Sequence, residues 1–242
     1  MKRCYSSTAM RDDSTARIQL LQLLQLADSA LPVGAAAHSF GLETLVEEGL
    51  LQVANLEIFF RDYLEEIGTI ESAFCRAAHK LVASPHERVQ SWIDLNCRLS
   101  ALKPAREART GSATLGRRFL QLVAGLGSWP ILTEALIASQ QSETEIHQSP
   151  AFGLTGGVLG IDEETTALAF LQQSLTGLIS ACQRLLPLGQ SRAVRMLWDL
   201  KPAITESLKR SETDLEEVAC FTPSIEMAAM RHPVLATRLF IS

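Results

Sequence analysis

Apolar side chains recur every three to four residues along most of the chain, which is the spacing of one face of an α-helix. Residues 56–67 show this period most clearly, and no stretch alternates convincingly as a half-buried strand would. The predicted fold class is therefore all-α, a single-domain helical bundle of about ten helices that occupies residues 17–222. The helices are expected near 17–27, 39–49, 55–67, 70–83, 85–99, 104–123, 131–140, 147–161, 162–186, 191–200 and 203–210.

Two of these helices have unusual compositions. Residues 165–183 carry no charged side chain, but their Ser, Thr and Gln content is too high for a membrane span. They predict a helix that is wholly buried or lies at a subunit interface. Residues 147–161 hold four glycines in an apolar context. A strand–turn element would explain them, but we favour a helix whose glycines allow close contacts.

The two ends of the chain differ from the middle. Residues 1–16 contain basic residues without an apolar run behind them, so they predict a disordered leader and not a secretory signal. Residues 223–242 are too apolar for a solvated tail, and Pro223 and Pro233 prevent one long helix. This segment either packs on the core of its own chain or serves as a partner-docking tail.

The least generic stretch is Ser29–Gly49. Eight of its residues are Pro, Gly or Ala, which favours close backbone approach over solvation. A polar cluster of His38 and Ser39 follows, and Glu43 opens an acidic helix. The stretch is either a site or a packed corner, and its residues alone leave both open.

Bulk composition limits the function classes. The chain has 242 residues, 47% hydrophobic, and a net charge of −5. The absence of a basic stripe argues against nucleic acid as the main partner. Five cysteines without a C-x-x-C spacing argue against a disulfide framework or a standard zinc site, and they indicate a reducing, cytoplasmic environment.

No self-contained chemistry emerges from the motifs. The five histidines lie far apart without a helical ligand pair, so no metal site is predicted, and His38 is only a weak candidate. The glycines of 153–160 lack the lysine of a phosphate loop. Ser39 beside His38 does not form a catalytic pair by adjacency. The arginines of 106–118 most simply form a solvated face, although one could act on a partner's nucleotide. No catalytic residue and no bound cofactor are therefore expected.

Four stretches in order nevertheless resemble the urease accessory protein F (UreF) family. The first is L-P-x-G followed by Ser, Gly, Leu and Glu, and the second is the Arg…Gly-Arg segment of 109–117. The third is P-L-G-Q at 187–190, and the fourth is the C-terminal signature of 226–242. The sequence departs from the family at Ala36, where Phe is usual, and at Pro233, where a polar residue is common.

The resemblance implies an all-α, dimeric protein without catalysis of its own. Such a protein is a scaffold and nickel-insertion chaperone that links the D/H accessory protein to the G-subunit GTPase and delivers nickel to apo-urease. Nickel would be handled by the complex and not stably bound, and the C-terminal segment would dock on the D/H partner. The implied partner-binding residues are Pro32, Gly34, His38, Ser39, Glu43, Glu226, Met230, Arg231, His232, Arg238, Leu239 and Phe240.

Two other functions stay open. One is a helical enzyme that binds a small ligand in a pocket near residues 34–43. The other is a nickel carrier that uses His38. No nucleic-acid or membrane partner is expected in any of the three cases.

Overall fold

The computed structural model describes residues 8–218 and 221–242, and the expectations for residues 1–7 and for Cys4 and Cys220 fall outside this range. Within it the chain forms twelve α-helices and no strand, which confirms the all-α prediction. The helices are α1 (Thr8–Leu26), α2 (Leu42–Glu47), α3 (Leu56–Tyr63), α4 (Thr69–Lys80), α5 (Arg88–Ala101), α6 (Arg106–Ala124), α7 (Pro130–Gln141), α8 (Gln148–Val158), α9 (Glu163–Leu185), α10 (Gln190–Asp199), α11 (Lys201–Arg210) and α12 (Pro223–Arg231).

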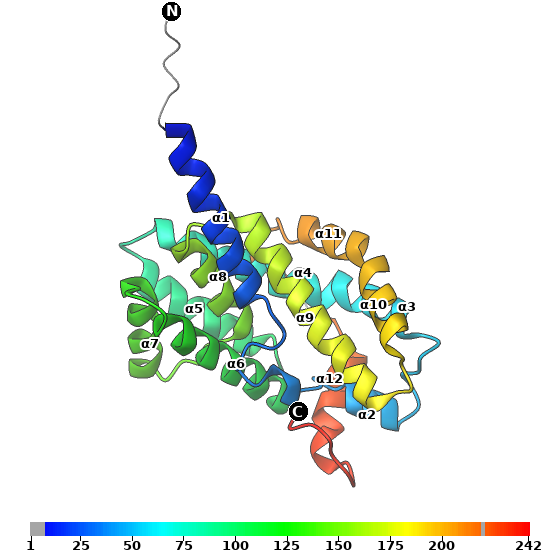
Figure 1. Cartoon of the computed structure of the whole chain (residues 1–242). Coiled ribbons are helices and arrows are strands. Elements are labelled where there is room, and N and C mark those ends of the chain that lie inside the picture. The colour runs from blue at the N-terminus through cyan, green and yellow to red at the C-terminus, as the bar shows by residue number, and fades with distance from the viewer. Residues whose placement is uncertain (1–7, 219–220) are drawn as a thin grey trace, which may run out of the picture.

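Helix α8 lies at the centre of the bundle. It packs against α4, α6 and α9, which surround it in Figure 1. Its residues from Ser149 to Gly156 are all buried. The preference for a helix over a strand–turn element is confirmed, and the glycines have the expected role. A side chain at Gly153 would clash with the carbonyl of Cys75 on α4, so glycine is what lets the two helix axes approach.

Helix α9 begins where the sequence places it, and a side chain caps its first turn. The side chain of Asp162 accepts a hydrogen bond from the backbone N–H of Thr165 at 2.8 Å. One face of α9 is buried against the core, but its other side is only half-covered, as at Leu168 and Gln172. The wholly buried reading of this helix is therefore wrong. None of the helices in the described part of the chain is long and apolar enough to cross a bilayer.

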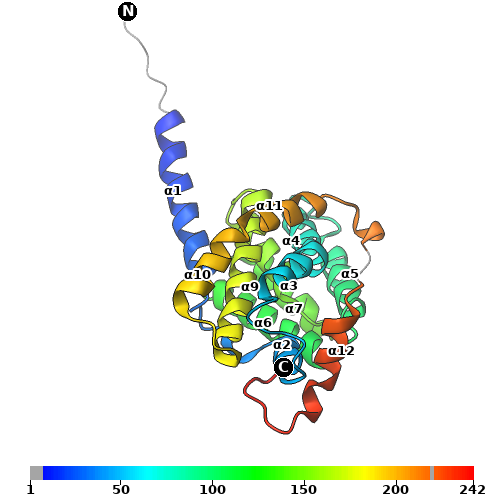
Figure 2. The same cartoon turned by 90° about the vertical axis from the view of Figure 1, so that its right-hand side faces the viewer.

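Helix α1 starts earlier than the sequence analysis placed it. The expected disordered leader extends to residue 16, whereas α1 already begins at Thr8. No Pro or Gly separates Thr8 from Arg17, and extending an existing helix costs far less than starting one. The helix projects from the body (Figures 1 and 2), and Leu21 and Leu24 are more than half exposed on it.

Several predicted helix starts shift by a few residues. Asn55 lies at the start of α3, but its side chain accepts from Gln52 N instead of capping the helix. Helix α5 begins at Arg88, three residues after Pro85. The N-cap of α2 is Gly41 and not Ser39, because the chain turns there with a φ of +92° that favours glycine.

The C-terminal segment packs on its own chain. Helix α12 contacts α2 and α6, and the chain then turns back so that residue 242 lies beside the 37–43 corner at the bottom of Figure 1. Ile225, Ala228 and Ala229 are the buried face of α12. Of the two readings left open for residues 223–242, the free chain adopts the one that packs on its own core.

Candidate functional site

The residues singled out in the sequence meet where the C-terminal segment crosses the 37–43 corner. We call this arrangement the C-terminal clasp: residues 232–242, residues 37–43 and Glu107 of α6. Its centre is the carboxylate of Glu43, which is only 7% exposed. One oxygen accepts from the backbone N–H of Leu239 at 2.6 Å, and the other accepts from that of Phe240 at 3.1 Å. The second oxygen also lies 2.8 Å from His232 Nε2.

These contacts fix the charge of Glu43. Burial alone would raise its pKa, but the hydrogen bonds from Leu239, His232 and Phe240 together hold the pKa below its ordinary value. Glu43 is therefore an ionised carboxylate that satisfies two backbone N–H groups of the C-terminal segment. A helix-surface glutamate in sequence thus serves as the anchor of a remote segment.

His232 lies between two carboxylates and is fully buried. Its Nε2 faces Glu43, and its Nδ1 lies 2.6 Å from Oε2 of Glu107. The guanidinium of Arg238 lies 3.4 Å from the other oxygen of Glu107. The acidic side chains of Glu43 and Glu107 and the basic side chains of His232 and Arg238 therefore lie close together.

The final residues are held by backbone contacts. Ile241 N–H donates to the carbonyl of Ala37 at 2.8 Å, and the main-chain oxygen of Ser242 accepts from the N–H groups of Ser39 and Phe40. Ser242 Oγ lies 2.7 Å from His38 Nδ1. Burial, with the nearby Arg118 guanidinium, holds the pKa of His38 below its ordinary value, so its ring is neutral near pH 7.

An aromatic side chain closes the clasp. The ring of Phe240 is buried, and the guanidinium of Arg184 lies 4.2 Å above its centroid, a cation–π geometry. Arg184 also donates to the carbonyl of Ala36. The segment is thus joined to α9 as well as to α2 and α6.

The predicted partner-binding residues fall into two groups. His38, Ser39, Glu43, His232 and Phe240 are buried in the clasp, so in the free chain these side chains contact the C-terminal segment or the corner that holds it and are not open to a partner. The physical reason is that their polar atoms satisfy the backbone and side chains of the returning segment.

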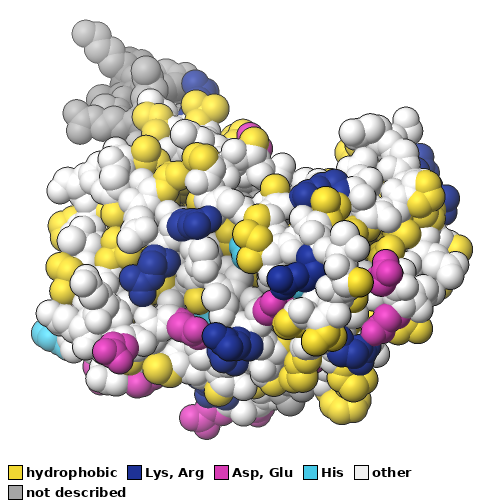
Figure 3. Space-filling view, turned by 90° about the horizontal axis from the view of Figure 1, so that it is seen from below, with side chains coloured by type: hydrophobic (Ala, Val, Ile, Leu, Met, Phe, Trp, Pro, Cys, Tyr) yellow, Lys and Arg dark blue, Asp and Glu magenta, His cyan; other side chains and the backbone are white. Residues whose placement is uncertain are grey.

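The other predicted residues lie around the clasp, and most are solvent-accessible. Arg231 forms two contacts of 2.7 Å with Glu48, and Arg238 pairs with Glu107. Glu226 accepts from the N–H of Ala105 at 3.1 Å. Gly34 has a φ of +90° beside Arg118. Pro32, Met230 and Leu239 are exposed. Figure 3 shows the molecule from below, and on this face hydrophobic side chains lie among charged ones.

A cavity of about 250 Å³ lies beside the clasp. Its lining is mainly apolar and includes Ala35, His38 and Phe40, so it coincides with the pocket position expected near residues 34–43. Gln173 Oε1 and Ser174 Oγ also belong to lining residues, and neither atom has a protein partner. Space of this size beside unpaired oxygens suits ordered water or a small hydrogen-bond donor.

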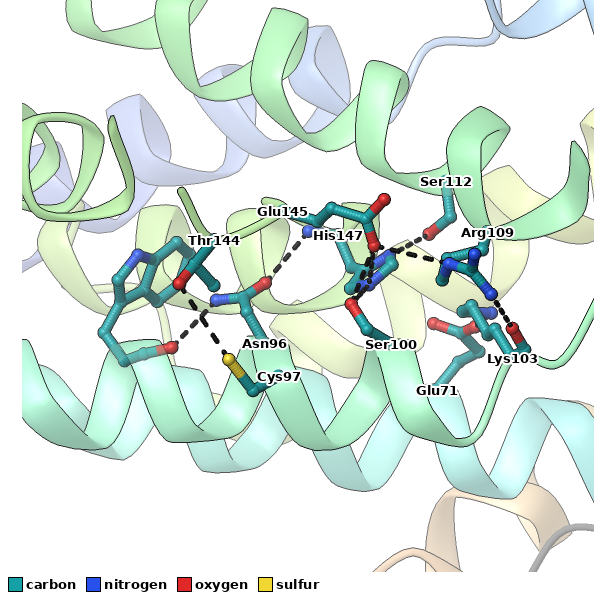
Figure 4. Close-up of polar contacts among 11 residues, drawn as sticks. Glu71, Asn96, Cys97, Ser100, Lys103, Arg109, Ser112, Thr144, Glu145 and His147 are labelled. Carbon is teal, nitrogen blue, oxygen red and sulfur yellow. Dashed lines mark hydrogen bonds and ion pairs between the residues drawn. The ribbon is translucent and has the colours of Figure 1, made fainter. Parts of the chain in front are cut away.

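A buried polar network around His147 escaped the sequence analysis (Figure 4). The His147 N–H donates to Asn96 Oδ1 at 2.9 Å, and its ring nitrogens lie 2.7 Å from Ser100 Oγ and 3.1 Å from Ser112 Oγ. Burial, followed by the nearby Lys103 charge, lowers the pKa of His147 to about 3. The ring is therefore neutral and ties α5 and α6 to the start of α8.

The same network contains a buried ion pair. Lys103 and Ser149 both donate to the carboxylate of Glu71. Burial would raise the pKa of Glu71, but Lys103 and then Ser149 lower it overall, so the pair is ionised. No local signal could have revealed this network, since its members come from α4, α5, α6 and the loop before α8. No group of three His, Cys, Asp or Glu side chains in the described residues is arranged to hold a metal ion.

The fold and the clasp together define a single-domain helical protein that holds its own C-terminal segment by ionic contacts. Comparison with known proteins then gives the family. A sequence model of the UreF family matches residues 51–201. The urease accessory protein UreF of Lachnoclostridium phytofermentans is 33% identical over 228 residues, which is 92% of this chain and 98% of that protein.

Two further relatives agree with this result. The urease accessory protein UreF of Corynebacterium glutamicum (strain R) is 33% identical over 91% of this chain and 96% of its own length. That of Bacillus sp. (strain TB-90) is 29% identical over 93% and 99%. The chain belongs to the UreF family of urease accessory proteins, as the four sequence stretches predict.

Proposed function

We propose that this protein is a non-catalytic scaffold and nickel-insertion chaperone for urease maturation. In this proposal it acts in the cytoplasm as a homodimer, and it links the D/H accessory protein to the G-subunit GTPase beside apo-urease. Nickel passes through the assembled complex without stable binding to this chain, and the scaffold couples delivery to GTP hydrolysis.

The observation that supports the proposal is the apolar surface that the clasp presents. Leu239 is 54% exposed, Ile241 68% and Val234 81%, although Phe240 between them is buried. The buried residues hold the backbone, so the exposed side chains are already ordered for a partner. Pre-ordering removes part of the entropy cost of association, and apolar groups exposed side by side are typical of a binding surface.

The test is capture of the D/H protein by the full-length chain, scored also by urease activation in the presence of the GTPase. Leu239→Asp combined with Ile241→Asp places two charges on the proposed surface. We expect capture to fall at least about tenfold, as for central interface residues. Leu126→Asp is the matched control, because Leu126 is 60% exposed but lies in the loop after α6. Equal capture by both variants and the unmodified chain would refute the docking surface.

A second candidate function has one specific observation in its favour. Gln173 lines the cavity beside the clasp, and its buried Oε1 has no hydrogen-bond partner in the protein, which suits a small ligand with an N–H or O–H group. A thermal-shift screen of metabolites without any partner tests it. A ligand-specific rise that Gln173→Leu abolishes would favour a ligand-binding protein, and stability unchanged across the screen would count against it.

A further inference from the structure

The clasp contains one ionic arrangement that packing alone does not require. His232 has no exposed surface, and carboxylate oxygens lie at both of its ring nitrogens, 2.8 Å from Nε2 and 2.6 Å from Nδ1. A neutral imidazole carries hydrogen on only one nitrogen. With both carboxyl groups ionised, both short contacts are hydrogen bonds only when the ring carries two hydrogens and a positive charge.

We propose that His232 is a proton-dependent lock that sets whether the C-terminal segment lies in the clasp. The charges around the ring balance in the locked state. Glu43 of α2 and Glu107 of α6 supply two negative charges, while His232 and Arg238 supply two positive charges. Loss of the ring proton leaves a net negative charge around the buried ring and sets a nitrogen lone pair against a carboxylate oxygen.

The neighbouring charged groups do not replace the lost proton. On α12, Arg231 faces away toward Glu48, the residue that follows α2, and makes two contacts of 2.7 Å with it. Glu226 accepts from the N–H of Ala105 instead of facing the ring. Arg238 contacts Oε1 of Glu107, whereas His232 faces Oε2. Arg238 therefore does not take the place of the hydrogen that a neutral ring lacks.

Deprotonation of His232 affects the C-terminal segment directly, because Glu43 contacts both the ring and the backbone of the segment. The oxygen that faces His232 Nε2 also accepts from Phe240 N–H, and its companion oxygen accepts from Leu239 N–H. If the Glu43 carboxylate moves away from a neutral ring, it therefore also loses its hydrogen bonds with the backbone of the segment. The consequence for docking rests on the proposed function, but the lock itself does not.

The sign of the pH dependence follows from the charges. The locked state binds one more proton than the open state, so rising pH favours opening by up to about tenfold in the open-to-closed ratio per pH unit. At the acid end the depressed pKa of Glu43 acts in the opposite direction, because protonation of that carboxyl removes the acceptor of Leu239 and Phe240. The clasp is therefore closed in a window that protonation of Glu43 limits below and deprotonation of His232 limits above.

Nuclear magnetic resonance of the full-length protein tests the lock without a partner. The ¹⁵N shifts of the His232 ring report two attached hydrogens in the closed state, assigned by comparison with His232→Gln. Amide exchange protection factors of Leu239 and Phe240, corrected for intrinsic rates, report closure. We expect protection to fall with rising pH, in step with the change of the ring signal to that of neutral imidazole.

Glu107→Gln is the decisive variant. Its amide can donate to Nδ1 of a neutral ring while Nε2–H donates to Glu43, so every contact is satisfied without the proton. We expect this variant to keep the clasp closed at the alkaline end, where the unmodified chain opens. A neutral ring in the closed clasp, or equal pH dependence in Glu107→Gln and the unmodified chain, would overturn the proposal.

Partner capture separates the lock from the scaffold function. Capture of the D/H protein should decline with rising pH in the unmodified chain but not in Glu107→Gln. If no capture occurs at any pH while the magnetic-resonance results stand, the scaffold proposal fails and the lock survives. If capture occurs but the protection of Leu239 is independent of pH, the lock fails and the scaffold survives.

Discussion

Replacing Glu43 with glutamine should loosen the C-terminal segment without unfolding the helical body. The variant keeps the shape of the side chain but has only one acceptor oxygen. Its NH₂ group must face either the N–H of Leu239 or the pair formed by His232 and the Phe240 N–H, so at least one donor meets a donor. The perturbation therefore acts on the polar contacts of the clasp and leaves the core volume unchanged.

The size of the effect can be worked out from the contacts. A hydrogen bond to a charged group contributes about 1.5–3 kcal/mol, and removing one partner of a buried ion pair costs about 3–5 kcal/mol. Because glutamine retains one acceptor, we expect the lower end, about 3 kcal/mol. That value corresponds to roughly a 100-fold rise in the open-to-closed ratio of the clasp.

Amide hydrogen exchange at neutral pH measures this ratio directly at Leu239 and Phe240. We expect their protection to fall about 100-fold, with little change in α8, because the clasp opens locally. Glu48→Gln is the matched control. Glu48 follows the helix that carries Glu43, and the substitution removes the exposed ionic partner of Arg231. It should change the amide exchange of Leu239 and Phe240 only slightly. Unchanged protection of both amides in Glu43→Gln would refute the assignment of Glu43 as the anchor.

Three further changes test the core. Gly153→Ala places a methyl group against the carbonyl of Cys75, so chemical denaturation should show a loss of about 1–3 kcal/mol, and an unchanged midpoint would contradict the close α4–α8 contact. Lys103→Met leaves the buried carboxylate of Glu71 unpaired, and the free energy of unfolding should fall by about 3–5 kcal/mol near pH 7 and by less at acid pH, where that carboxyl is protonated. Since burial lowers the pKa of His147 to about 3, the unfolded state takes up a proton that the folded state excludes. Stability should therefore fall by up to about 1.4 kcal/mol per pH unit from about pH 6.5 toward pH 3, a slope that His147→Gln should reduce in acid titrations monitored by circular dichroism.

Local features of the chain were predictable because their causes are local. The apolar period of 56–67 lies on α3 and the π-helical turn that follows it, Leu64–Gly68. Asp162 caps α9 because its side chain reaches an N–H only three residues away. The start of α5 was less predictable, since Pro85 fits a first helical turn as well as the loop that actually holds it.

For the site, the sequence predicted many of the residues involved but not how they contact one another. Most of the side chains that make the contacts of the C-terminal clasp, although not Glu107, were singled out in sequence. Their mutual contacts depend on pairs such as Glu43 and Leu239, which are 196 residues apart. The residues alone therefore left the tail undecided between packing and docking. His147 shows the same limit, because its partners Ser112 and Ser100 lie 35 and 47 residues away and no short motif joins them.

The balance of forces in the clasp explains why charge decides its state. After α12, Phe240 is the only large apolar side chain that is buried in residues 233–242. One buried side chain does not offset the conformational entropy that ten ordered residues lose. The polar contacts of the segment must therefore supply much of the remainder, and those to Glu43 depend on the ionisation of that carboxylate. A partner that covers Leu239 and Ile241 would add the apolar burial that the free chain lacks, so binding and closure should reinforce each other.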